Sequence, residues 1–278
     1  MPMQPTTAVL IALLGACVGS FINVVAWRLP RQESVVLPAS HCPRCGARLR
    51  WWENLPVLSW LLLRGHCGHC GATIPPRYPA VELLCAGLFV AAAAATPSGL
   101  GPAAAPLAAL AGWLLVGLLL PLLLIDLDQL WLPEPLCRWG LMLGLVVTAI
   151  AGFSQGDGSG RSLLLWHLLA ASAGLLGFEA TSGVAQRLLG KPALGLGDAK
   201  LAALLGAWLG LTGLGLTVLL AVFGGGLVGG IGLVSGRLRR GQPLPFGPFL
   251  AAAGLAVWLL GNGFWLQQLG GRLGWGAL

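Results

Sequence analysis

The chain has 278 residues, of which 56% are hydrophobic, only 9% are charged and 43 are glycine. Its mean hydropathy is +0.83. These values lie far outside those of soluble domains and predict an all-α polytopic membrane protein. The net charge of +7 does not indicate nucleic-acid binding, because the sequence has no basic domain with interleaved aromatic residues.

Apolar runs of membrane-spanning length recur along the chain. A transmembrane helix needs about 20 apolar residues, and eight runs approach this length. They lie roughly at 6–27, 79–96, 106–125, 135–152, 163–182, 199–212, 216–236 and 246–266. The sixth and seventh come from one run, 201–234, which is too long for a single span and which we divide at 212–215.

The basic residues predict the orientation of these spans. With the loop 28–77 in the cytoplasm, 14 of the 16 Lys and Arg residues lie on that side, as is typical of short cytoplasmic loops. Both chain ends then face outward. The run LGAC (14–17) is similar to a lipoprotein cleavage site, but residues 1–9 carry no Lys or Arg, so the pattern favours an uncleaved first span.

The sequence therefore divides into three parts. Residues 1–27 form the first transmembrane helix, residues 28–78 form a polar cytoplasmic domain, and residues 79–278 form the remaining helices. The polar domain has too little aliphatic content to build a core of its own, so we expect a bound metal to supply much of its folding free energy.

Two Cys-x2-Cys pairs lie in the polar domain, Cys42 with Cys45 and Cys67 with Cys70. Two such pairs, 21 residues apart, can close one tetrahedral site, which is the pattern of structural zinc. Two disulfides are the alternative, but disulfides rarely persist on the cytoplasmic side. A neighbouring histidine could replace one thiolate; the candidates are His41, His66 and His69.

Aromatic and polar residues gather beside these cysteines: Trp51, Trp52, Glu53, Asn54 and Trp60. Packing at the membrane interface, where Trp is favoured, is one interpretation of this cluster and the simpler one. A pocket for a cationic ligand, attracted by the aromatic faces, is the other.

Acidic residues are rare in this chain, and two stand where apolar runs end or begin. Asp126 ends the third run, and Asp198 follows Gly195-Leu196-Gly197 at the start of the sixth. If these helices pack together, the two carboxylates can share a polar pocket, activate water and protonate a leaving nitrogen, as in aspartyl proteases. Each motif alone is weak, because Gly-x-Gly-Asp can arise by chance and Asp is a common helix N-cap.

Taken in order, these motifs resemble those of the type IV prepilin leader peptidases. The resemblance rests on the two cysteine pairs and on the following runs: GSFINVV (19–25), RLP (28–30), NLPVLSWL (54–61), RYPAVELL (77–84), IDLD (125–128), LP (132–133), GLGDAKL (195–201) and PFGP (245–248). Three positions depart from the expected pattern: Glu53, His66 and Glu134.

The resemblance implies a bifunctional enzyme of the bacterial cytoplasmic (inner) membrane. Asp126 and Asp198 would cleave the basic leader of type IV prepilins or type II secretion pseudopilins on the cytoplasmic side. The enzyme would then methylate the new N-terminus with S-adenosylmethionine. The domain at 28–78, with its zinc site at Cys42, Cys45, Cys67 and Cys70, would serve methylation, and residues 79–278 would form the transmembrane aspartyl peptidase domain. The expected partners are the pilin substrates and the lipid bilayer.

Three other functions remain open. A presenilin-like membrane protease also uses Gly-x-Gly-Asp, although PAL (192–194) precedes Asp198 here rather than following it in a later helix. A proton-coupled transporter would use the acids as a relay, but this leaves the cysteine domain unexplained. A transferase could hold Mg²⁺ through Asp126 and Asp128.

The methyl donor needs a binding surface of its own. No glycine-rich loop follows a strand, so a Rossmann-type methyltransferase domain is excluded on this pattern. An aromatic or acidic cradle would suit the sulfonium cation. The candidates are the loop at Trp51, Trp52 and Glu53 and the start of the second span at Arg77 and Glu82.

Overall fold

The structure, a computed structural model, describes residues 3–95, 105–154, 158–190, 195–239 and 242–273. Lys191, the run 192–194 and Arg240 lie outside the described residues. Within the described part the fold is helical, with no strand and only two isolated β-bridges. This confirms the predicted fold class.

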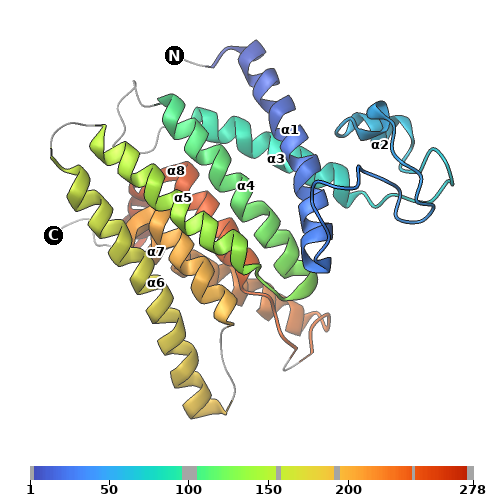
Figure 1. Cartoon of the computed structure of the whole chain (residues 1–278). Coiled ribbons are helices and arrows are strands. Elements are labelled where there is room, and N and C mark those ends of the chain that lie inside the picture. Colours follow the sequence, from blue (N-terminus) through green and yellow to red (C-terminus); the bar gives the residue numbers. More distant parts are fainter. Residues whose placement is uncertain (1–2, 96–104, 155–157, 191–194, 240–241, 274–278) are drawn as a thin grey trace. The chain divides into compact units, whose positions relative to one another are not determined.

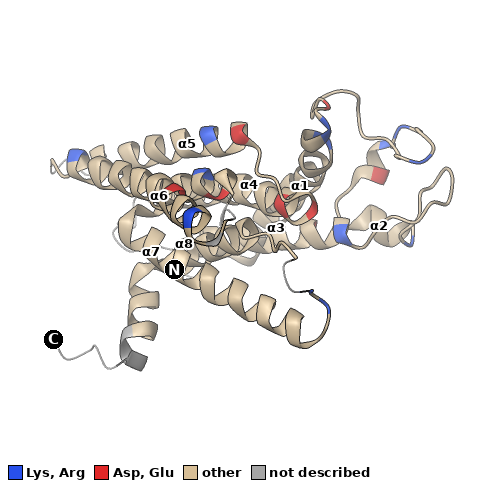
Figure 2. Ribbon diagram, turned by 90° about the horizontal axis from the view of Figure 1, so that it is seen from below, with Lys and Arg blue, Asp and Glu red and all other residues tan. Residues whose placement is uncertain are grey.

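Within the described residues, seven helices are long and apolar enough to span a membrane, so the chain is a multi-pass membrane protein. Most of their length carries no charge (Figure 2). They are α1 (Pro5–Arg28), α3 (Arg77–Ala94), α4 (Ala105–Gln129), α5 (Glu134–Phe153), α6 (Gly160–Leu189), α7 (Leu196–Val234) and α8 (Gly247–Leu273), drawn in Figure 1. Between α1 and α3 lie only short elements: η1 (Leu29–Arg31), η2 (Trp51–Asn54) and α2 (Leu58–Leu62).

The chain forms two compact units. The first comprises residues 1–95 and 108–121, and the second comprises residues 96–107 and 122–278. The first unit therefore contains α1, the cysteine domain and α3. The sequence predicts a boundary at 78/79 and so assigns α3 to the peptidase domain. That boundary divides the chain by function, and it stays a prediction.

Within the first unit, α1 and α3 pack closely through small residues. A Cβ atom on Gly15 or Gly19 would lie 2.8 Å from a backbone atom of α3, so only glycine permits this approach. Trp113 of α4 stacks on Phe89 with 5.6 Å between ring centroids and donates its indole N–H to the Phe89 carbonyl.

In the second unit, α7 is not one straight helix but two segments that run in opposite directions. Its 39 residues are interrupted at Gly210, which has φ 68° and ψ −175°. Just after this break, a Cβ on Gly213 would lie 3.2 Å from Oδ1 of Asn262. Further on, a Cβ on Gly225 would lie 3.4 Å from the ring of Phe249. The second segment is therefore antiparallel to α8.

The first segment of α7 runs parallel to α8 instead. Both begin beside Leu132, because Cβ atoms on Gly197 and Gly247 would lie 3.0 and 3.3 Å from its side chain. Farther along, Gly254 of α8 lies against Leu205 of α7. The two segments of α7 correspond to the sixth and seventh predicted runs, which the structure places in one element, α7. The predicted dividing point at 212–215 was wrong, since the break is at Gly210.

Side chains from two other helices stabilise this break. The carbonyl of Ala207, three residues before it, accepts hydrogen bonds from Oγ1 of Thr148 (3.2 Å) and Nδ1 of His167 (2.9 Å). Carbonyls at a helix end need such partners. The adjacent Trp208 donates its indole N–H to the Gly140 carbonyl at 2.8 Å. Side chains of α5 and α6 thus fix where the first segment of α7 ends.

Candidate active site and metal centre

The two predicted acids lie in the second unit and are buried at the same end of it. Asp126 is in the last turn of α4 and is 5% exposed, and Asp198 is in the first turn of α7 and is 9% exposed. Asp126 touches the start of α8 at Gly247, while Asp198 adjoins Gly197, and Leu132 contacts both of these glycine positions.

The hydrogen bonding of the two acids differs. Oδ2 of Asp198 accepts the backbone N–H of Gly195 at 3.1 Å, which orients this carboxylate at the start of α7. Oδ2 of Asp126 is buried and makes no hydrogen bond within the described residues. Buried polar atoms without a partner are uncommon and are often found at functional sites.

Gly247 is a part of this site whose role sequence reasoning missed, although it lies in the PFGP run. A Cβ at this position would lie 2.6 Å from Oδ2 and 3.1 Å from Cγ of Asp126. Because Gly247 has no Cβ, the start of α8 can lie against the Asp126 carboxylate. Only the clustering of α4, α7 and α8 in space, which the run does not encode, gives this glycine its place.

The other acids expected nearby have different surroundings. Glu134 pairs with Nζ of Lys200 at 2.7 Å, so its charge is compensated. Asp128 is exposed and also interacts with another residue. Among the acids that the structure describes at this end of the unit, only Asp126 and Asp198 are therefore buried.

In the first unit, the four paired cysteines come together as the sequence predicts. Their Sγ atoms all lie within 4.8 Å of one another, and Cys42 and Cys70 are 3.9 Å apart. Zn–S bonds of about 2.3 Å in a tetrahedron give sulfur–sulfur distances of about 3.8 Å, so the cluster fits zinc. None of the seven cysteines forms a disulfide.

The two cysteine pairs share one backbone geometry. In each loop the first cysteine exchanges backbone hydrogen bonds with residues on the far side: Cys42 with Gly46 and Ala47, and Cys67 with Gly71 and Ala72. Gly46 and Gly71 have φ of 70° and 69°, which a side chain would strain. Hydrogen bonding from the backbone N–H of Cys45 lowers the pKa of the Cys42 thiol.

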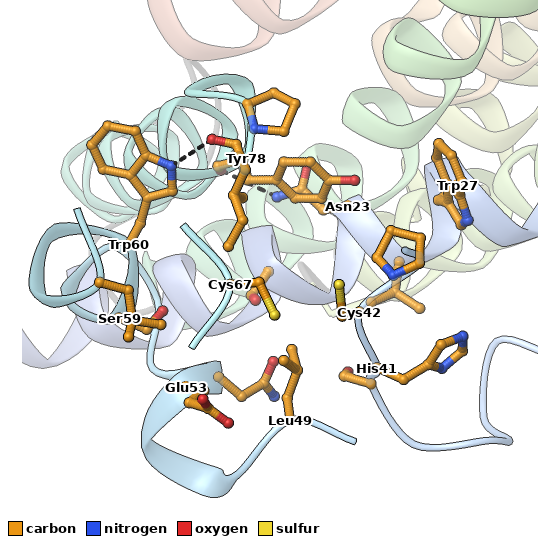
Figure 3. Close-up of a pocket in the computed structure, with 18 of the residues that line it drawn as sticks. Asn23, Trp27, His41, Cys42, Leu49, Glu53, Ser59, Trp60, Cys67 and Tyr78 are labelled. Atoms are coloured by element: carbon orange, nitrogen blue, oxygen red, sulfur yellow. Dashed lines mark hydrogen bonds between the residues drawn. The ribbon is translucent and has the colours of Figure 1, made fainter. Parts of the chain in front are cut away.

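A cavity of about 450 Å³ adjoins the cysteines (Figure 3). Glu53, Asn54, Trp60 and Glu82, all singled out from the sequence, line it. Trp51 and Trp52 do not: they are 75% and 43% exposed and contact each other edge to face. Arg77 does not line it either.

Buried polar residues missed by the sequence analysis also line this cavity. Asn23 donates to the Tyr78 carbonyl at 3.2 Å, as Figure 3 shows, and Arg28 is 6% exposed. Glu53 is held by the backbone N–H of Arg50 at 2.8 Å. This hydrogen bond, together with nearby His69, keeps the pKa of the Glu53 carboxyl below its usual value.

Comparison with known proteins agrees with this arrangement. Residues 13–96 match the family described as the Bacterial Peptidase A24 N-terminal domain, and residues 113–230 match the Type IV leader peptidase family. No solved structure matches the chain.

Several curated proteins named prepilin leader peptidase/N-methyltransferase are similar along most of their length. The Burkholderia pseudomallei (strain K96243) protein is 39% identical, over 93% of this chain and 87% of its own. The Stutzerimonas stutzeri protein is 38% identical over 93% of each chain. The Aeromonas hydrophila protein is 38% identical, over 91% of this chain and 90% of its own. This chain therefore belongs to the type IV leader peptidase family.

Proposed function

We propose that this protein cleaves the leader of type IV prepilins or type II pseudopilins and then methylates the new N-terminus, both on the cytoplasmic side of the bacterial inner membrane. The names of its relatives support both activities. The observation that carries the peptidase assignment is the buried pair Asp126 and Asp198 at the meeting point of α4, α7 and α8.

The pair acts as one general acid and one general base. Asp126, with its unpaired Oδ2, binds and deprotonates the attacking water, and the protonated partner transfers a proton to the leaving nitrogen. Gly195 holds Asp198 in position through its backbone N–H. Glycines at 197 and 247 let α7 and α8 begin in close contact with Leu132 and the Asp126 carboxylate.

The methylation step requires S-adenosylmethionine as the methyl donor. The lone pair of the neutral N-terminal amine attacks the methyl carbon, and the carbon–sulfur bond breaks with its electron pair passing to sulfur. The products are S-adenosylhomocysteine and a methylated ammonium group. An amine that arrives as ammonium must first lose one proton to a base or to water.

Zinc has a structural role in this proposal. Cys42, Cys45, Cys67 and Cys70 would hold it, and the metal would order the domain that carries the cavity. The sulfur positions fit a tetrahedral ion, while Glu53 beside His69 supports the second cysteine loop.

Asparagine substitutions test the peptidase assignment. Asp126→Asn and Asp198→Asn should each abolish cleavage of a prepilin, because either change removes the acid–base pair, while Asp128→Asn should retain most activity. The measurement is mass spectrometry of the product N-terminus. Methylation of a pre-cleaved pilin by the same variants is the control for folding. Wild-type cleavage by either Asn variant would reject the mechanism.

Removal of a metal ligand tests the cysteine domain. Cys42→Ser should release zinc and reduce methylation of a pre-cleaved pilin much more than it reduces leader cleavage, since metal binding supplies folding free energy to this domain. Cys17→Ser, at an exposed position outside the cluster, is the matched control. A zinc-free variant that methylates normally would contradict the assignment.

A further inference from the structure

The cavity in the first unit lies where the end of α1, the cysteine domain and the start of α3 meet (Figure 3). Its volume of about 450 Å³ is in the range of small-molecule sites. Figure 3 shows the Trp60 and Tyr78 side chains on one side of it and the Glu53 side chain on another. The cavity thus combines aromatic surface with charged groups.

Two arginines line this cavity, Arg28 and Arg44, and of the two only Arg28 is buried. Its side chain is 6% exposed, and it donates one hydrogen bond, to the Ser34 carbonyl at 3.1 Å. Among the residues that the structure describes, no carboxylate lies within 4.0 Å of its guanidinium. A buried charge without a counter-ion is costly, so this position favours an anionic ligand group.

Three glutamates, Glu33, Glu53 and Glu82, line the same cavity. Glu82 of α3 is 8% exposed, and its Oε2 accepts the backbone N–H of Val57 at 2.7 Å. The Glu53 side chain is 6% exposed. A ligand that is complementary to the lining of this cavity carries an anionic group and a cationic group, joined to an aromatic or apolar part.

We propose that this cavity binds the methyl donor and that Arg28 pairs with the carboxylate of its methionine end. The guanidinium matches a carboxylate in planar, two-point fashion. Glu82, with the aromatic rings, provides the negative surroundings that a sulfonium cation requires. This inference rests on the proposed methylation activity and identifies the cavity in which the methyl donor binds.

Direct binding to the full-length protein tests the proposal without relying on turnover. The probes are labelled S-adenosylhomocysteine, which has the carboxylate, and 5′-methylthioadenosine, which lacks the whole amino-acid end. Arg28→Gln should weaken binding of S-adenosylhomocysteine by roughly 10- to 100-fold, the range for a hydrogen bond to a charged group. Binding of 5′-methylthioadenosine should change by less than about twofold, because it has no carboxylate to lose.

Arg48→Gln is the matched control, since Arg48 is exposed in the same domain and does not line the cavity. It should bind both probes as the wild type does. Equal loss of both probes in Arg28→Gln, or no loss of S-adenosylhomocysteine, would overturn the role of Arg28.

A comparison on the unaltered protein covers the case in which Arg28→Gln does not fold. Wild-type protein should bind decarboxylated S-adenosylmethionine at least tenfold more weakly than S-adenosylmethionine, and equal affinities would overturn the inference. Methylation of a pre-cleaved pilin by the same wild-type sample separates the two proposals. If that sample methylates but shows no carboxylate preference, only the inference fails; if it does not methylate, the proposed function fails.

Discussion

At the scale of single residues, the candidate active site requires a glycine beside one of its two acids. Asp126 has an unpaired buried oxygen next to Gly247, where even one methyl group would lie within 2.6 Å of that oxygen. The glycine therefore sets how closely α8 can approach the carboxylate.

Gly247→Ala tests this relation. The added methyl group should displace the Asp126 carboxylate and reduce prepilin cleavage by roughly a hundredfold, the cost of a misplacement of about 1 Å at a reacting centre. Gly263→Ala is the control, because a Cβ there would meet nothing within 4 Å. Cleavage at the wild-type rate by Gly247→Ala would show that this approach does not position the acid.

Residue-scale prediction from the sequence succeeded where spacing carries the information. Cys42, Cys45, Cys67 and Cys70 follow from a repeated local pattern, and the structure brings them together. Arg28 could not be found in this way, because residues 28–77 hold seven arginines and only the packing of the domain on α1 buries this one.

At the scale of elements, the break at Gly210 decides the course of α7. A φ of 68° with ψ of −175° is a conformation that is open essentially to glycine alone. The residues that follow can then double back along α8 instead of continuing the first segment.

Gly210→Ala should therefore destabilise the protein by about 1–3 kcal/mol, the typical cost of a residue forced into such a conformation. Thermal unfolding in detergent measures this. Gly215→Ala, five residues away and with open space around its Cβ position, should have little effect. A Gly210→Ala variant as stable as Gly215→Ala would contradict the strained geometry.

Hydropathy predicted the bounds of most helices to within a few residues but misplaced this break. The run contains glycines at 206, 210, 213 and 215, and nothing local distinguishes them. Thr148 and His167, on helices far away in the sequence, provide the hydrogen bonds that end the segment after Ala207. The position of the break is thus set by tertiary contacts.

At the scale of the whole molecule, the reversal determines the topology of the C-terminal half. With α7 as two antiparallel segments, the loop between α7 and α8 returns to the end of the unit at which Asp198 lies. The basic residues Arg237 and Arg239 then face the same side as the C-terminal end of α6. The positive charges predict that this shared side is cytoplasmic, which stays a prediction.

Reporter insertions in cells test this topology. A green fluorescent protein placed after Arg187 or after Arg239 should fluoresce, because the positive charges predict that both sites are cytoplasmic, whereas alkaline phosphatase placed after Thr212 should be active on the outer side. The same reporters exchanged between the three sites are the controls. Active phosphatase after Arg239 would mean that α7 crosses the membrane once.

The reversal also limits how deep in the bilayer the peptidase chemistry takes place. The segment from Leu196 to Leu209 has 14 residues, or about 21 Å at 1.5 Å per residue, and the part of α8 before its own break at Gly261 is equally short. A hydrocarbon core is about 30 Å thick. If the break lies at the outer interface, the segment begins about 9 Å below the inner headgroups and Asp198, two residues further along, lies about 12 Å below them, unless the bilayer thins around it. A pilin could then keep its apolar helix in lipid while only its leader crosses the headgroup layer.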